Sequence, residues 1–256
     1  MGDTQSGDMK VIEAFWDKTT LNLPCYELEI SADDSSNAIH NEINIIENQH
    51  ERVYIVAKVP VKCILACNVL CERQFRFTES QIMYSISKSR FDLIKGSCFT
   101  GYEGVALQLV NCTAHLEKII EQIKQNIFNT DRIALDDRFG VDLANIRYAN
   151  WVRSAFLLSD IDLHEVHVDN TAIGFCMTKK AQSTVVGLLA GVYNHYKDSG
   201  YFYDILYNII SHYMARGYRA FKADVSANNM GVLKIYQSIG LMLTDIKYVF
   251  TKVKEG

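Results

Sequence analysis

Two side chains near the end of the chain could take part in proton transfer and hydrogen bonding to a ligand. Asn229 and Tyr236 are seven residues apart, about two turns of a helix, so they lie on one side of any helix that spans them. The residues between them favour a short helix over 229–239, which Gly240 would end. A tyrosine on that side could donate a proton to a leaving thiolate. The alternative is that Tyr236, one of 14 tyrosines, packs in the core.

A loop leads into the clearest helical pattern of the chain. Apolar residues recur at helical spacing from Phe202 to Arg216, and Asp198 or Ser199 could cap the start of this helix. The N–H groups of a first turn lack helical partners and the helix dipole is positive there, so the loop 192–200 could hold a pyrophosphate. Any strand, loop and helix produce such a terminus, and an ordinary capped helix is the alternative.

The C-terminal half supplies the elements that would position these groups. Asp169-Asn170 suits a hairpin turn, and Gly217 suits the left-handed position after the long helix. The polar segment 129–142 lacks apolar periodicity and predicts a domain boundary. The expected elements are a helix over 145–158, strands over 163–169, 172–178 and 183–192, a helix over 202–216, a strand over 218–225, a helix over 229–239 and one or two strands over 241–253.

A similar alternation of strands and helices precedes the boundary. Strand 53–59, helix 61–74 and one or two strands over 75–87 form a compact strand–helix–strand unit. The pattern predicts a mixed α/β protein with a disordered N-terminus over 1–9, an N-terminal domain over 10–130 and a C-terminal domain over 131–256. Further expected elements are strand 26–30, polar loop 32–37, a weak helix over 42–49, strand 104–110 and helix 116–128.

Segment 228–241 resembles the closing motif of the GNAT N-acetyltransferase superfamily, in which an Asn, a helix, a Tyr and a Gly-aromatic pair follow one another. The last pair is Gly240-Leu241 here, so Leu replaces the aromatic residue. Strand 185–190 resembles the family's fourth strand. Loop 197–202 resembles its acetyl-CoA pyrophosphate motif, except that Phe202 stands where a small residue is expected.

This resemblance implies a GNAT-like fold with splayed central strands, preceded by a smaller degenerate copy of the same topology. It also implies acetyl-CoA, or another acyl-CoA, as cofactor, and direct transfer to an amine without an acyl-enzyme. Backbone N–H groups near Leu189, Ala190 and Gly191 would stabilise the oxyanion, and Tyr236 would protonate the thiolate. The other residues implied to bind the cofactor are Lys197, Ser199, Gly200, Tyr201, Phe202 and Asn229.

A narrower resemblance concerns the acceptor. Bacterial acetyltransferases that act on dTDP-4-amino-4,6-dideoxygalactose (dTDP-fucosamine) are similar to this chain at Trp16-Asp17, 53–84, 137–139 with Asp142, and 147–153. The resemblance implies a nucleotide-linked amino sugar as the small-molecule substrate, with Asp137 and Arg138 facing it. Arg138 could engage a nucleotide diphosphate, or could equally form a salt bridge at the boundary.

The general base stays open among four side chains, His195, His167, Glu165 and Asp137. Two other function classes are also open: a non-catalytic GNAT-like module that binds acyl-CoA or a protein partner, and an N-acyltransferase for a non-sugar amine. A homodimer is compatible with each of them.

Composition limits the partners. The 256 residues carry a net charge of −4, without the basic surplus typical of nucleic-acid binders. No apolar run predicts a signal peptide or membrane span, and the odd number of cysteines, seven, favours reduced thiols in the cytoplasm. We expect no metal site, because Cys63, Cys67 and Cys71 suit core packing, and His164 and His167 would point to opposite faces of a strand.

Overall fold

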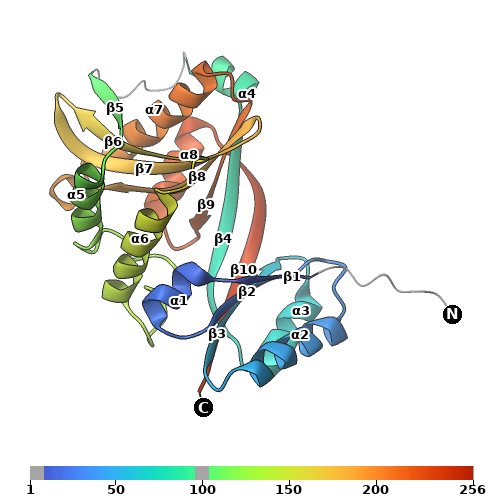
Figure 1. Cartoon of the computed structure of the whole chain (residues 1–256). Helices are drawn as coiled ribbons and strands as arrows, with labels where there is room; N and C mark the ends of the chain where they lie inside the picture. The colour runs from blue at the N-terminus through green and yellow to red at the C-terminus, as the bar shows by residue number, and fades with distance from the viewer. Residues whose placement is uncertain (1–8, 96–103, 256) are drawn as a thin grey trace. The chain divides into compact units, whose positions relative to one another are not determined.

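The computed structural model describes residues 9–95 and 104–255. The chain divides into two compact units, the first made of Met1–Gln81 and Asp245–Gly256 and the second of Ile82–Thr244. Strands β4 (Arg76–Ser87) and β10 (Met242–Lys254) run through both units (Figure 1). The boundary predicted near residue 130 lies inside the second unit. It falls in the loop between two helices, α5 (Thr113–Ile123) and α6 (Val141–Ala155), that pack on each other.

The first unit contains a parallel strand–helix–strand crossover. Its strand order is β1-β2-β3-β10, with β2 parallel to β3 and the other pairs antiparallel. Ile39, Ile43 and Ile46 of α2 are buried at helical spacing against β3. Its elements are β1 (Lys10–Glu13), α1 (Phe15–Leu21), β2 (Cys25–Glu29), α2 (Ser36–Gln49), β3 (Val53–Pro60) and α3 (Ile64–Glu72).

The second unit is a sheet with helices on both faces. Its strand order is β4-β9-β8-β7-β6-β5. Strand β8 is parallel to β9, whereas the β5–β6, β6–β7 and β7–β8 pairs are antiparallel. The elements after β4 are α4 (Lys88–Ile94), β5 (Val105–Leu109), α5 (Thr113–Ile123), α6 (Val141–Ala155), β6 (Ile161–Val168), β7 (Thr171–Ala181), β8 (Thr184–Val192), the 3₁₀ turn η1 (Asn194–Tyr196), α7 (Tyr201–Ala215), β9 (Ala220–Ser226) and α8 (Met230–Ile239).

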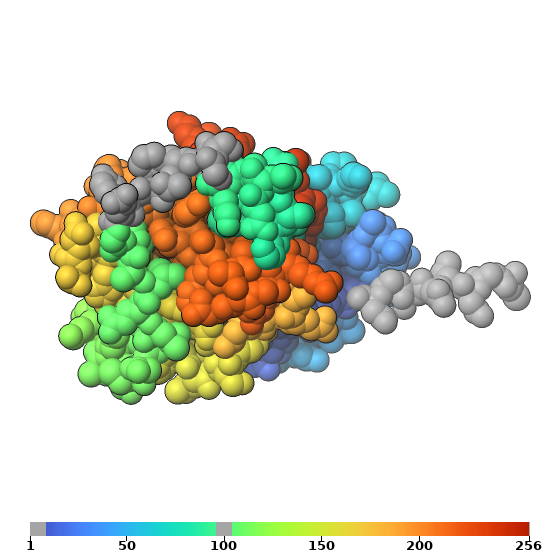
Figure 2. All heavy atoms as spheres, turned by 90° about the horizontal axis from the view of Figure 1, so that it is seen from above, coloured from blue at the N-terminus to red at the C-terminus, as the bar shows by residue number. Residues whose placement is uncertain are grey.

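Two apolar cores cover the faces of this sheet. Buried residues of α4, α7 and α8 form one core with the sheet, and buried residues of α5 and α6 form the other (Figure 1). Figure 2 looks onto the first face, where α7 lies between β5 and α4. We call these the α7 face and the α5 face. The alternation of strand side chains therefore decides which helix layer each residue meets.

Local sequence explains several element boundaries. Asp169 and Asn170 both have positive φ, 49° and 64°, which is the type I′ hairpin geometry that their sequence predicted. Helix α2 begins earlier than expected because the Ser35 hydroxyl accepts a hydrogen bond from the Ala38 N–H at 3.2 Å. Three short elements, β1, α1 and α4, were not predicted, because four to seven residues give too little periodicity.

None of the helices within the described residues is long and apolar enough to cross a membrane. The N-terminal segment that the sequence predicts to be disordered lies outside the described residues, except for Met9.

Candidate active site

The central parallel strands of the second unit separate part of the way along their length. Their ladder runs from Thr184↔Ala220 to Gly187↔Ala223 and stops, although β8 continues to Val192 and β9 to Ser226. The splayed arrangement expected from the sequence is therefore confirmed. The open edge of β8 beyond Gly187 offers backbone groups to a ligand.

A bulge in β8 marks the start of this open segment. Met177 pairs with Leu189 but Thr178 pairs with Gly187, so Leu188 is an extra residue without a partner in β7. A bulge bends its strand and re-aims the following groups. Pairing with β7 then resumes through Leu189, Ala190 and Gly191. Because successive strand residues direct their N–H groups to opposite edges, part of this segment's backbone faces β7 and part faces the opening.

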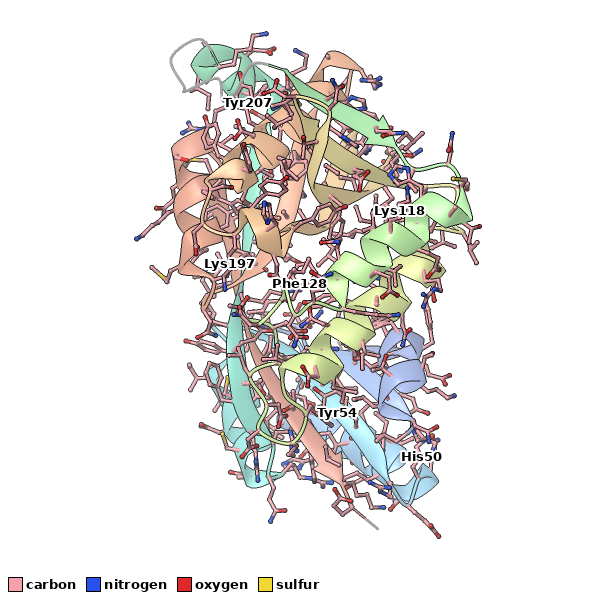
Figure 3. All side chains as sticks on the ribbon, turned by 90° about the vertical axis from the view of Figure 1, so that its left-hand side faces the viewer. His50, Tyr54, Lys118, Phe128, Lys197 and Tyr207 are labelled. Carbon is pink, nitrogen blue, oxygen red and sulfur yellow. The ribbon has the colours of Figure 1, made fainter. Side chains whose placement is uncertain are left out.

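Gly191 is required by close packing on the α5 face. A Cβ atom there would lie 2.9 Å from Ile127 Cδ1 and 3.1 Å from the Phe128 ring. Phe128 comes from the loop after α5, where its N–H is held by Asn145 Oδ1 at 3.0 Å. Figure 3 shows Phe128 and, across from it, Lys197 from the loop after β8. Asn194 Nδ2 donates to Gln125 O at 2.5 Å and ties these two loops together.

The loop after β8 leads into the N-terminus of α7, where the helix dipole is positive. Asp198 and Gly200 take left-handed φ values of 64° and 87°, and α7 begins at Tyr201, one residue before the predicted start. The N-cap is Gly200 rather than Asp198 or Ser199, although the Ser199 hydroxyl does accept from the Tyr201 N–H at 3.2 Å. Lys197, Ser199 and Gly200 are exposed, so the helix terminus is accessible to an anion.

Phe202 occupies a position that suits its size. Its half-buried side chain packs against the core of the α7 face. Leu241 behaves similarly: it is buried in the same core, and its N–H donates to Tyr236 O at 2.9 Å. The two departures from the family motif are thus accommodated by packing.

Asn229 and Tyr236 come from the two ends of α8. The Asn229 Oδ1 atom caps α8 by accepting from the Val232 N–H at 3.2 Å, a role that sequence analysis did not assign. Tyr236 is only 6% exposed and lies in the α7-face core. Burial raises the pKa of its hydroxyl, and the nearby Cys176 and Asp224 raise it further, so the phenol is protonated throughout the neutral range.

The crossover of the first unit lacks these features. All five residues of β2 pair with β3, from Cys25↔Tyr54 to Glu29↔Lys58, so its parallel strands are closed. The loop before α2 carries Asp33 and Asp34 and no basic residue. A helix terminus flanked by two carboxylates repels a phosphate. Of the two crossovers, the one between β8 and β9 is suited to an anionic ligand with a long arm.

Two of the four candidate bases meet in one cluster on the α5 face. The Glu165 carboxylate is within 2.6 Å of His115 Nε2, 3.1 Å of His167 Nε2 and 2.7 Å of the Tyr193 hydroxyl. His115 and Tyr193 were missed in the sequence, because they lie 50 and 28 residues away from Glu165 and carry no motif. The other two candidates, His195 and Asp137, are exposed.

His164 lies on the opposite face of β6 from His167, as the alternation of the strand predicted. It is 3% exposed and its ring is 5.1 Å from that of His212 in α7. Burial, together with the neighbouring His212, lowers the pKa of His164 to about 4. His164 therefore belongs to the interior and not to the cluster around Glu165.

The proposed acceptor residues occupy the loop between α5 and α6. The Arg138 guanidinium forms a two-point ion pair with Asp136, at 2.8 Å from Nε and 2.5 Å from Nη2. A salt bridge was one of the two roles that the sequence left open for Arg138, the other being substrate binding. Asp137 is exposed. Asn126 Nδ2 donates to Asp142 Oδ1 at 2.6 Å and ties the loop to the start of α6.

Comparison with solved structures addresses the fold. A GCN5-related N-acetyltransferase from Sphaerobacter thermophilus matches with a TM-score of 0.65 and 11% identity, over 96% of this chain and 76% of that one. A tandem GNAT protein from the clavulanic acid biosynthesis pathway, solved without AcCoA, matches with a TM-score of 0.55 and 8% identity, over 91% of this chain and 76% of that one. This chain has the GNAT fold.

A third match widens this set. A functionally unknown conserved protein from Staphylococcus epidermidis has a TM-score of 0.62 and 14% identity, over 90% of this chain and 84% of that one. No protein-family model and no curated protein matches the sequence. The GNAT fold of this chain is thus recognised from its three-dimensional structure. Sequence identities this low do not establish its chemistry, which depends on its own residues.

Proposed function

We propose that this chain is an acyl-CoA-dependent N-acyltransferase that transfers an acetyl or similar acyl group to a primary amine. The observation that carries the proposal is the opening between β8 and β9, whose ladder ends at Gly187↔Ala223 directly before an exposed helix terminus. A CoA thioester has the matching shape, a long amide-bearing arm that ends in a pyrophosphate.

The cofactor contacts follow from this placement. The pantetheine arm hydrogen-bonds those backbone groups of Leu189, Ala190 and Gly191 that face the opening, while the others pair with β7. The pyrophosphate is bound at the start of α7, by Lys197 and by the backbone of Ser199, Gly200, Tyr201 and Phe202. Asn229 uses its Oδ1 atom to cap α8, which leaves its amide NH₂ to donate to a carbonyl of the arm.

The chemistry is a direct transfer. The amine nitrogen attacks the thioester carbonyl carbon, the new C–N bond forms, and the C–S bond breaks. Amides of the bulged β8 segment stabilise the oxyanion, a type of contribution worth about 3–4 kcal/mol in well-studied enzymes. The thiolate takes a proton from Tyr236, which is protonated at neutral pH, and a proton from solvent then restores the Tyr236 hydroxyl. The proton lost by the amine goes to a base or to water.

The acceptor we propose is the amino group of a nucleotide-linked amino-deoxysugar. Asp137 and Arg138 lie in the loop between α5 and α6, and the resemblance of segment 137–139 to sugar-amine acetyltransferases supports a role in acceptor binding. Arg138, whose guanidinium is paired with Asp136, would engage a phosphate of the acceptor nucleotide.

Thiol release from acetyl-CoA tests the proposal. The purified chain is given a panel of nucleotide-linked amino sugars, simple amino sugars, peptides and polyamines, and Tyr236→Phe is compared with the control Tyr248→Phe, a partly buried tyrosine of the first unit. We expect a rate with at least one amine that falls about 100-fold in Tyr236→Phe only. Acetyl-CoA binding without turnover on any amine would instead indicate a non-catalytic module, and turnover restricted to non-sugar amines would overturn the sugar assignment.

A further inference from the structure

The end of β8 is held by buried polar bonds on the side away from β9. Tyr193 directly follows β8, and its hydroxyl donates to Glu165 Oε1 in β6 at 2.7 Å. Both residues are nearly buried, at 5% and 7% exposure. The next residue, Asn194, bonds the loop after α5 through Gln125 O. Two successive residues at the mouth of the opening are therefore anchored toward β6 and α5.

The Glu165 carboxylate has hydrogen-bond partners on both of its oxygens. Its second oxygen receives His115 Nε2 from α5 and His167 Nε2 from its own strand. A buried carboxylate is costly unless its lone pairs are filled, and here three donors converge on it. The carboxylate thereby links α5, β6 and the end of β8 at one point.

The position of Tyr193 connects this anchor to the opening. Its N–H bonds Ile173 O in β7 at 2.9 Å, and its ring stacks on Phe175 with centroids 6.5 Å apart. Beyond Gly187 the other edge of β8 has no ladder to β9, so contacts on the β7 and β6 side must fix its course. The loop that carries Lys197 begins at the very next residue, Asn194, whose carbonyl accepts from the Lys197 N–H at 3.1 Å.

We infer that Glu165 and Tyr193 are positioning residues that keep the β8–β9 opening in its cofactor-binding shape and fix the start of the pyrophosphate loop. The inference rests on the proposed function, because the shape is that of a cofactor site. A hydrogen bond is directional, whereas the Phe175 stack would tolerate sliding of the ring. The hydroxyl–carboxylate bond therefore fixes the position of the strand end, so the strand does not have to rearrange when the cofactor binds.

The test is the affinity of acetyl-CoA for variants that remove one bond each. Tyr193→Phe keeps the ring and its stack on Phe175, and Glu165→Gln keeps the side-chain shape. We expect each to weaken acetyl-CoA binding about tenfold in calorimetry. In Tyr193→Phe the KM for acetyl-CoA should rise similarly while kcat changes less than about twofold, and the double variant should bind acetyl-CoA little worse than either single variant.

A matched control separates positioning from general destabilisation. Tyr213→Phe removes another nearly buried hydroxyl of the same unit, which donates to Asp162 Oδ2 at 2.9 Å on the α7 side. It should lower the melting temperature comparably and leave acetyl-CoA affinity unchanged. Equal losses of affinity in all three variants would overturn the inference. Should Glu165→Gln fail to fold, Tyr193→Phe alone decides.

The remaining outcomes distinguish the inference from the function on which it rests. A wild-type chain that binds neither acetyl-CoA nor CoA would overturn both. Wild-type binding that Tyr193→Phe leaves unchanged would overturn the positioning role only, and the proposed acyltransferase would stand.

Discussion

The ring of Tyr236 lies edge-on against the ring of Tyr84, with centroids 5.3 Å apart and planes at 73°. This is the favourable geometry for two aromatic side chains, and it brings the end of α8 against β4. A side chain wedged this way has few orientations open to it. The contact explains how a single tyrosine on a ten-residue helix is held in one orientation.

Alkaline pH should destabilise the chain through three tyrosines. Burial raises the pKa of Tyr193, Tyr213 and Tyr236 above the ordinary value of 10. The unfolded chain therefore loses these protons at about pH 10 while the folded chain keeps them, so the contribution of these tyrosines to the free energy of unfolding is constant below that pH and falls above it. Urea unfolding from about pH 9 to about pH 11 measures this fall. Tyr236→Phe should make it shallower, and an unchanged slope in this variant would contradict the assignment.

Acid should destabilise the chain through His164. Its pKa is about 4 in the folded chain and 6.5 as the ordinary value, so below pH 6.5 the unfolded state binds a proton that the folded state does not. Stability should fall as pH decreases from 6.5 to about 4, by up to about 3 kcal/mol, and this contribution should level off below. His164→Leu should remove most of this dependence, measured by urea unfolding across that range. The exposed His195, changed to Gln, serves as the control and should leave the profile as in the wild type.

Substitutions at Asn229 should separate its two roles. Asn229→Ala removes the cap of α8 and should cost about 1 kcal/mol of stability. Asn229→Asp keeps an oxygen that accepts from the Val232 N–H but loses the NH₂ donor. We expect it to retain the melting temperature and to weaken acetyl-CoA binding about tenfold. Comparison of thermal unfolding with calorimetric titration of both variants decides the matter, and full affinity in Asn229→Asp would rule out the proposed contact.

Gly240 should be far less replaceable than Gly200. Both have φ of +87°, but a Cβ at Gly200 meets open space, whereas one at Gly240 would lie 2.3 Å from Ile94 Cδ1. Gly200→Ala should cost about 1 kcal/mol from backbone strain alone, and Gly240→Ala clearly more. Chemical denaturation gives both values. Adding Ile94→Ala should recover part of the stability lost in Gly240→Ala. A double variant that is less stable than the sum of the two single losses predicts would contradict the steric explanation.

The parts of the fold that local chemistry dictates could be predicted from the sequence. The long helix was expected over 202–216 and lies at Tyr201–Ala215, because its apolar residues recur over several turns. The Asp169-Asn170 turn was predictable since both residue types tolerate positive φ. The splayed strands followed from a resemblance to a family and not from periodicity.

Other features depend on contacts between distant residues and left no local trace. The bulge at Leu188 arises from pairing with β7, and nothing in the run of apolar residues around it marks the extra position. Two of the three donors to Glu165 come from a helix 50 residues before it and a strand end 28 residues after it. The capping role of Asn229 was not predicted, because the family resemblance assigned that side chain to cofactor binding.

The path of β10 has a consequence for how the protein is made. Its residues 247–254 pair with β3, yet nearly all of the second unit is translated between those two strands. While the ribosome is still synthesising the second unit, β3 presents an unpaired edge on one side. The first unit can close its sheet only after the second has emerged, so the order of completion is the reverse of the order of synthesis.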